Sequence, residues 1–182
     1  MRTTMRRTKA TWLISISGLL PLALAHPPSE FAGEKPNILF AIADDWGWPH
    51  ASAYGDAVIK TPTFDRLAQE GALFHHAYVS SPSCTPSRGA ILTGQWHWRL
   101  EGAGNLWSVL PDHFDTYPEI LAAAGYETAS RSKAWGPGRT ETAGRHPACP
   151  PGPKSLREFV ASVPEGKPWC YWLGSHDPHR GY

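Results

Sequence analysis

The sequence is poor in cysteine, in excess charge and in long apolar stretches. Three cysteines among 182 residues cannot build a disulfide framework, so each thiol needs its own explanation. The 17 Lys and Arg residues nearly balance the 16 Asp and Glu residues, which excludes the basic excess typical of nucleic-acid-binding proteins. Residues 26–182 contain no apolar run long enough for a membrane helix. A chain of this length has room for one globular domain with its own core.

The first 25 residues have the features of a secretory signal peptide, in the required order. Four cations and no acid precede an apolar stretch from Trp12 to Leu20, and the segment ends in an Ala-Leu-Ala tripeptide. We predict cleavage after Ala25 and a secreted or periplasmic protein without a membrane anchor; a retained anchor is the alternative. Cleavage leaves 13 basic against 16 acidic side chains. Residues 26–35 are polar and contain proline, as in a flexible lead-in.

From residue 36 onward, short apolar segments alternate with short helical patterns. Residues 37–43 form a continuous apolar run too short for a helix, typical of a strand buried on both faces. The further expected elements are helices over 61–71, 86–93 (with Thr85 as N-cap), 118–124 and 154–163, strands over 72–79, 126–130 and 168–174, and a surface loop over 136–152. The alternation predicts an α/β domain with a mostly parallel sheet flanked by helices. Functional sites in such sheets lie at the carboxyl ends of the strands.

Two adjacent carboxylates, Asp44 and Asp45, follow the first predicted strand. Like charges side by side are unfavourable unless a cation neutralises them, and their oxygen ligands suit Ca²⁺ or Mg²⁺. Alternatively, one carboxylate caps a turn at Trp46-Gly47 while the other is solvated. The pair alone leaves both interpretations open.

The segment Cys84-Thr85-Pro86-Ser87-Arg88 is the strongest chemical signal in the sequence. It places a thiol just before the expected start of a helix, where unpaired N–H groups and the helix dipole favour an anion. Arg88 adds a fixed positive charge in the first turn. Such a site suits a tetrahedral oxyanion and a nucleophile that attacks it. The alternative is a buried Cys84 with Arg88 on a solvated helix face.

These residues resemble the type I sulfatase family. The run from Cys84 to Gly94 is similar to the family signature, in which a cysteine in a C-x-P-S-R context is oxidised to formylglycine. Three further pieces agree in order and spacing: Pro36-Asn37-Ile38 before Ala43-Asp44-Asp45-Trp46-Gly47, Thr61-Pro62 before Asp65-Arg66-Leu67-Ala68, and Gly71-Ala72-Leu73-Phe74 before Ala77-Tyr78. The resemblance covers residues 36–182. It implies the N-terminal part of an alkaline-phosphatase-like sulfatase domain, incomplete at the C-terminus.

The resemblance also implies a metal site and a nucleophile. Asp44, Asp45 and the modified Cys84 would bind Ca²⁺, with Mg²⁺ the less favoured ion. A formylglycine-generating enzyme would convert Cys84 to formylglycine (3-oxoalanine), whose hydrate would attack sulfur with one hydroxyl and expel sulfate with the other. Arg88 would hold the formylglycine and offset the charge of its hydrate.

Basic side chains would complete the catalytic and substrate-binding set. Lys133 falls where the family has a sulfate-binding lysine, and His179 aligns with a histidine that contacts the sulfate or protonates the leaving group. His176, in the same motif, is expected to bind substrate. The run from Ser175 to Arg180 is most similar to the heparan N-sulfatase branch and its bacterial relatives. The expected reaction is therefore hydrolysis of a sulfuric ester or sulfamate on a sulfated carbohydrate.

Tryptophans in predicted loops offer flat rings for sugar faces or hydrophobic plugs between loops. Those considered are Trp46, Trp48, Trp96, Trp98, Trp107 and Trp135. His97, after Gly94, is a further candidate to approach the site.

The sequence departs from the family at two points. Trp135 stands where many relatives have a histidine two residues after the sulfate-binding lysine, and the other metal ligands of the family lie downstream of Tyr182. The 182-residue chain is therefore expected to be inactive by itself. Two alternatives stay open: a sulfated-glycan- or anion-binding remnant with unmodified Cys84, and a phosphoesterase or phosphonate hydrolase of the same superfamily. Cys149 and Cys170 either pair in an oxidising compartment or pack in the core.

Overall fold

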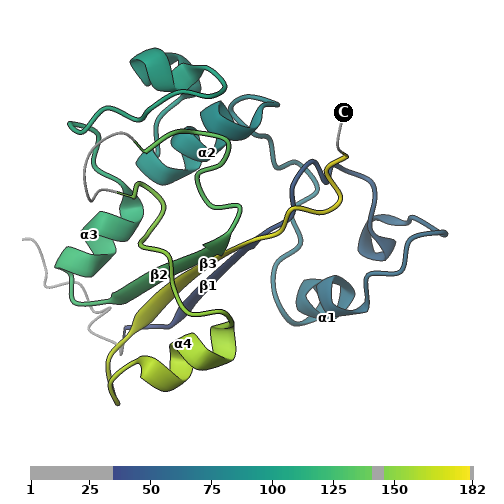
Figure 1. Ribbon diagram of the computed structural model, residues 1–182. Helices are drawn as coiled ribbons and strands as arrows, with labels where there is room; N and C mark the ends of the chain where they lie inside the picture. The colour runs from purple at the N-terminus through teal and green to yellow at the C-terminus, as the bar shows by residue number, and fades with distance from the viewer. Residues whose placement is uncertain (1–34, 141–145, 181–182) are drawn as a thin grey trace, which may run out of the picture. The chain divides into compact units, whose positions relative to one another are not determined.

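A three-stranded parallel sheet organises the described part of the chain (Figure 1). The structure is a computed structural model that describes residues 35–140 and 146–180, all within the unit Lys35–Tyr182. The strands β1 (Ile38–Ile42), β2 (Glu127–Ser132) and β3 (Trp169–Gly174) lie in the order β1-β3-β2 and are parallel. The predicted α/β class is thereby confirmed. The predicted signal peptide over 1–25 and the lead-in up to residue 34 lie outside the described residues.

Four α-helices accompany the sheet. They are α1 (Pro62–Glu70), α2 (Cys84–Thr93), α3 (Tyr117–Ala123) and α4 (Leu156–Ser162), and short 3₁₀ turns cover Ser52–Tyr54, His97–Arg99 and Glu101–Gly104. The helices expected over 61–71, 118–124 and 154–163 are thus confirmed; α1 and α4 are slightly shorter than predicted, and α3 has the predicted length but begins one residue earlier. None of the helices in the described ranges has the length and apolarity needed to cross a membrane.

Local hydrogen bonds determine where helices begin. At α3, the Thr116 backbone N–H donates to the Glu119 carboxylate at 3.0 Å, and the two residues form a capping box. At α4, the backbone N–H of Glu158 donates to the Ser155 hydroxyl at 3.2 Å. At the other end of a helix, α2 stops at Gly94, whose φ of 66° lies in the left-handed region that glycine adopts most easily.

The central strand β3 packs against a helix on each face. Its neighbouring residues Tyr171 and Trp172 are both fully buried and point to opposite sides, as successive strand residues do. Trp172 contacts Phe40 of β1, with ring centroids 4.9 Å apart, and stacks on Tyr117 of α3. Tyr171 packs against Phe159 of α4 at 4.9 Å. The two aromatic contacts place α3 and α4 on opposite faces of the sheet, as Figure 1 shows.

The first strand is not buried on both faces, contrary to the sequence prediction. Leu39 is 47% exposed and Ala41 is also exposed, whereas the alternate residues Ile38, Phe40 and Ile42 are half-buried. Among the described residues α4 covers the β2 side of this face, and an open groove of about 850 Å³ lies between β1 and α1. Apolar side chains such as Leu67 of α1 and Leu173 of β3 line that groove.

No strand forms over residues 72–79, so that prediction is wrong. Phe74, Tyr78 and Val79 are all more than half exposed, and the Phe74 carbonyl accepts a hydrogen bond from the Tyr54 hydroxyl instead of a strand neighbour. A strand-like composition is insufficient without a partner strand and a buried face.

The loop expected over 136–152 is not confined to the surface. In its described part, Ala148 and Cys149 are buried. Pro150 accepts a hydrogen bond from the Ser130 backbone N–H, and Gly152 donates one to the Ser130 carbonyl, both at 2.8 Å. The segment therefore runs along the outer edge of β2 and protects it. All three cysteines of the chain are free thiols.

The close approach of β3 to the residue after β2 yields a stability prediction. A Cβ atom on Gly174 would lie 1.9 Å from the Lys133 carbonyl oxygen. Gly174→Ala should therefore lower the free energy of unfolding by about 2 kcal/mol or more, because the backbone must move. The matched control is Gly102→Ala, whose added methyl group meets no atom within 4 Å and should change stability by less than about 0.5 kcal/mol. Urea unfolding followed by circular dichroism measures both; equal stability of the two variants would contradict the packing argument.

Candidate active site

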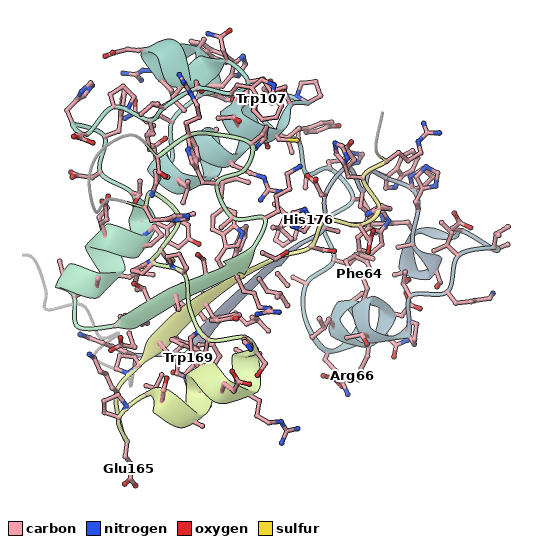
Figure 2. All side chains as sticks on the ribbon, in the orientation of Figure 1. Phe64, Arg66, Trp107, Glu165, Trp169 and His176 are labelled. Carbon is pink, nitrogen blue, oxygen red and sulfur yellow. The ribbon has the colours of Figure 1, made fainter. Side chains whose placement is uncertain are left out.

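Segments that follow all three strands meet at the carboxyl edge of the sheet. Asp44 follows β1, Lys133 follows β2, and residues 175–180 follow β3. Backbone hydrogen bonds connect these segments: Ser175 N donates to Ile42 O at 2.9 Å, Asp44 N to Asp177 O at 3.2 Å, and Lys133 N to Gly174 O at 3.1 Å. Figure 2 shows His176 at this end of the sheet. The expected position of the site at the strand ends is therefore found in the fold.

Asp44 lies at the centre of the site between two cations. Its side chain is 5% exposed. One carboxylate oxygen accepts a hydrogen bond from the Arg88 guanidinium at 3.1 Å, and the other accepts one from the Lys133 ammonium group. Lys133 comes from the end of β2 and Arg88 from α2, so a single carboxylate joins three elements.

The two cations keep Asp44 ionised. Burial by itself would raise the pKa of this carboxyl, but the hydrogen bonds and positive charges of Lys133 and Arg88 outweigh burial and lower the pKa below its ordinary value of 3.8. Asp44 is therefore negatively charged throughout the neutral range.

Cys84 lies in the first turn of α2, not before it. The helix begins at Cys84 with Ser83 as its N-cap, so the prediction of Thr85 as N-cap is wrong. The difference arises because Pro86 is tolerated anywhere in the first turn, where its missing N–H is not needed. The Cys84 sulfur lies 3.3 Å from Lys133 Nζ and 3.9 Å from Asp44 Oδ1. The half-buried thiol therefore faces a cation and a carboxylate.

Arg88 is buried, 2% exposed, so it does not lie on a solvated helix face. Besides Asp44, its guanidinium donates to the backbone carbonyls of Lys133 and Ala134. A buried guanidinium with three acceptors is fixed in position and brings a permanent positive charge next to Cys84.

The other predicted site residues, Asp45, His176 and His179, belong to the segments that follow β1 and β3. Asp45 has a left-handed φ of 58°, and the chain turns there so that its side chain is 53% exposed while Asp44 is buried. His179 Nε2 lies 3.6 Å from Asp45 Oδ2. His176 is exposed, and its carbonyl accepts a hydrogen bond from the His179 backbone N–H.

Metal-ligating atoms converge at this place. One ligand atom each from Asp44, Cys84 and His179 lie within 4.8 Å of one another. Asp45, which the sequence predicts as a ligand, is not one of these three residues. The Asp44 carboxylate is a hard donor of the kind that Ca²⁺ prefers, whereas a thiol is not, and Cys84 would fit such a cation after exchange of its sulfur for oxygen.

A pocket of about 730 Å³ opens above these residues. Asp44, Asp45, Cys84 and Arg88 line it. Sequence reasoning did not single out Ser81, Ser83, Ser87 and Arg180, which line it as well. These four residues lie within or near the two motifs, Cys84–Arg88 and Ser175–Arg180, and this position was the one sign in the sequence that they belong to the site.

The tryptophans separate into two groups. Trp135 is 2% exposed and is a core plug rather than a sugar-binding surface, whereas Trp46, Trp48, Trp96, Trp98 and Trp107 are between 38% and 68% exposed. His97 does not line the pocket; its ring and its backbone N–H both bond to the Ser80 hydroxyl at 2.9 Å.

Comparisons with known proteins agree with this geometry. The family model described as Sulfatase matches residues 36–143. An N-acetylgalactosamine-6-O-sulfatase of Bacteroides thetaiotaomicron is 40% identical over 99 residues, which are 52% of this chain and 19% of that protein. An N-acetylglucosamine-6-O-sulfatase of the same organism is 34% identical over 129 residues, 71% of this chain and 23% of that protein.

A solved structure shares the fold as well. It was determined in complex with its substrate D-glucosamine-2-N,6-O-disulfate, is 26% identical, and superposes with a TM-score of 0.63 over 80% of this chain and 35% of that one. The chain spans about a fifth of the length of the curated relatives it matches. With a family match over more than half of its residues and the corresponding fold, the chain belongs to the sulfatase family.

Proposed function

We propose that this site serves the hydrolysis of sulfuric esters, or sulfamates, on a sulfated carbohydrate. The observation that carries the proposal is the contact of Cys84 with Lys133 and Asp44 inside a lined pocket. The thiol stands where a nucleophile is needed, and the cations stand where the negative charge of a sulfate group would lie.

Cys84 would act as formylglycine, made by a formylglycine-generating enzyme. In hydrated form this group supplies a hydroxyl that attacks sulfur, which a thiol does not do in this family. The surrounding residues of the chain provide the electrostatics. Lys133, 3.3 Å from the sulfur, would bind a sulfate oxygen, and Arg88, fixed by backbone carbonyls, would offset the charge of the nucleophile.

Asp44 and Asp45 would hold Ca²⁺, with Mg²⁺ as the less favoured ion. Such a cation polarises sulfate oxygens and makes the sulfur more electrophilic. Both aspartates line the pocket beside Cys84, which supports a shared role.

His179 is the proton donor of the proposed reaction. Its Nε2 lies 3.6 Å from Asp45, and a carboxylate at that distance can orient an imidazole for proton transfer to the leaving oxygen or nitrogen. His176 stays a predicted substrate-binding residue, since its exposed ring could contact a substrate outside the pocket.

The substrate class is supported by the names of the relatives. Two matched proteins are sulfatases of N-acetylgalactosamine and N-acetylglucosamine, and the solved neighbour holds a sulfated glucosamine. A sulfated amino sugar of a glycosaminoglycan is thus the proposed substrate. We also propose export, with cleavage after Ala25, to the periplasm or the medium.

Conversion of Cys84 is the first test of the proposal. Co-expression with a formylglycine-generating enzyme should replace the sulfur of Cys84 by a carbonyl oxygen, which peptide mass spectrometry detects. Cys84→Ala provides the unconvertible control. The readout is conversion of Cys84 and not sulfate release, since the chain is expected to be inactive by itself. An intact thiol, in an experiment that fully converts a known sulfatase, would reject the catalytic function and favour the binding remnant.

Removal of the Lys133 charge should weaken sulfate binding. In the matured protein, Lys133→Met should raise Kd for inorganic sulfate by about tenfold or more, measured by NMR shift titration, because one cation beside the bound anion is lost. Lys167→Met is the matched control, since Lys167 Nζ pairs with Glu127 on the exposed end of the sheet at 2.7 Å. Equal affinities of the two variants would remove Lys133 from the sulfate-binding residues.

The charge of Asp44 should make stability depend on pH in acid. Its folded-state pKa is lowered below 3.8, so its ionised form stabilises the fold above that pH, and this contribution is lost as the pH falls through the folded-state pKa. Asp44→Asn should be about 3 kcal/mol less stable at pH 7, because two cations lose their counter-charge. The difference from the wild type should shrink as the pH drops below 3.8, as measured by urea unfolding at constant salt. A constant difference would show that Asp44 does not act through its charge.

A further inference from the structure

Two chemically different sets of side chains line the pocket above Cys84. Asp44, Asp45, Arg88 and Arg180 form the charged set, which we call the charged end. The aromatic side chains of Trp46, Trp48 and Tyr78 line the same pocket. A ligand that fills the pocket therefore meets fixed charges and flat apolar rings at the same time.

Two of these rings are unusually exposed for their size. Trp48 is 68% exposed and Tyr78 is 87% exposed, whereas Trp46 is held by a hydrogen bond from its indole N–H to the His50 carbonyl and by an edge contact with Phe64 at 5.5 Å. Trp48 and Tyr78, which we call the aromatic rim, thus have ring faces open to solvent. Exposed apolar surface that is contiguous and rimmed by polar residues marks binding sites, and both rings belong to one pocket that polar and charged residues also line.

The rim belongs to segments next to the catalytic residues. Trp48 is four residues after Asp44, and Tyr78 is six residues before Cys84, in the connection between α1 and α2 that passes this end of the sheet (Figure 1). Ser81 and Ser83, from the same connection as Tyr78, also line the pocket. Their hydroxyl groups offer hydrogen-bond donors and acceptors in the same pocket as the aromatic rim and the charged residues.

We infer that the aromatic rim binds the ring face of the sugar that carries the sulfate. A sulfated pyranose combines an anion, several hydroxyl groups and a flat face of C–H bonds, and the pocket presents a matching set: cations, serine hydroxyls and the rings of Trp48 and Tyr78. This inference rests on the proposed function, because the charged end must bind the sulfate. It assigns sugar recognition to two residues outside the catalytic set.

Binding experiments separate the two ends of the pocket. The full chain with its unmodified thiol is titrated with N-acetylglucosamine-6-sulfate and, separately, with inorganic sulfate, and Kd is determined by NMR shift titration. Trp48→Ala and Tyr78→Ala should each raise Kd for the sulfated sugar about tenfold and leave Kd for inorganic sulfate unchanged. Trp48→Phe should restore most of the affinity because a flat ring returns.

Trp107→Ala is the matched control. Trp107 is 63% exposed, close to the 68% of Trp48, but does not line the pocket, and Figure 2 shows it on the α2 side of the molecule. Its replacement should change neither dissociation constant.

Three results would overturn the inference. Unchanged affinity of the rim variants for the sulfated sugar would show that the rings do not touch it. An equal loss for sugar and inorganic sulfate would mean that the substitutions disturb the charged end. Concentration-dependent self-association that Trp48→Ala abolishes, with sugar affinity unchanged, would make the rim a protein contact. If the wild type shows no binding of inorganic sulfate at all, the proposed function itself would be rejected.

Discussion

The site depends on one buried carboxylate that pairs with two cations. Asp44 receives Arg88 from α2 and Lys133 from the end of β2, and it belongs to the end of β1. Burying any of these three charges alone would be costly, and together they satisfy one another. The position of α2 relative to the sheet, and therefore of Cys84, follows from this arrangement.

Backbone packing brings the three charges within reach of one another. Gly174 ends the central strand, and without a Cβ it allows the Lys133 carbonyl to approach closely. The same carbonyl accepts a hydrogen bond from Arg88, so the close approach of two strand ends also anchors the guanidinium. Trp172, two residues earlier, fixes β3 in the core against α3. Packing of the central strand and geometry of the site are thus consequences of the same few contacts.

The sequence predicted what depends on local pattern and on motif. The apolar runs at 37–43 and 168–174 became neighbouring parallel strands, and the C-x-P-S-R run became the start of a helix next to the strand ends. Prediction from the sequence failed where the structure of a segment depends on residues that are distant in the chain. The segment 72–79 has strand-forming residues but no neighbouring strand, and the open face of β1 depends on which elements cover it. The pairing of Asp44 with both Arg88 and Lys133 could not be predicted, because Arg88 lies 44 positions and Lys133 lies 89 positions after Asp44 in the chain.

Overall charge conceals the chemistry of this pocket. The whole chain has a net charge of +1, which suggests no preference for anions. Locally, however, Arg88 and Lys133 share the single carboxylate of Asp44, and the Lys133 ammonium group lies 3.3 Å from the Cys84 sulfur. Since the group is largely buried, its field is weakly screened by water. A sulfate ester beside Cys84 would meet this positive charge, so the anion recognition proposed for the site would come from the arrangement of three side chains and not from an abundance of basic residues.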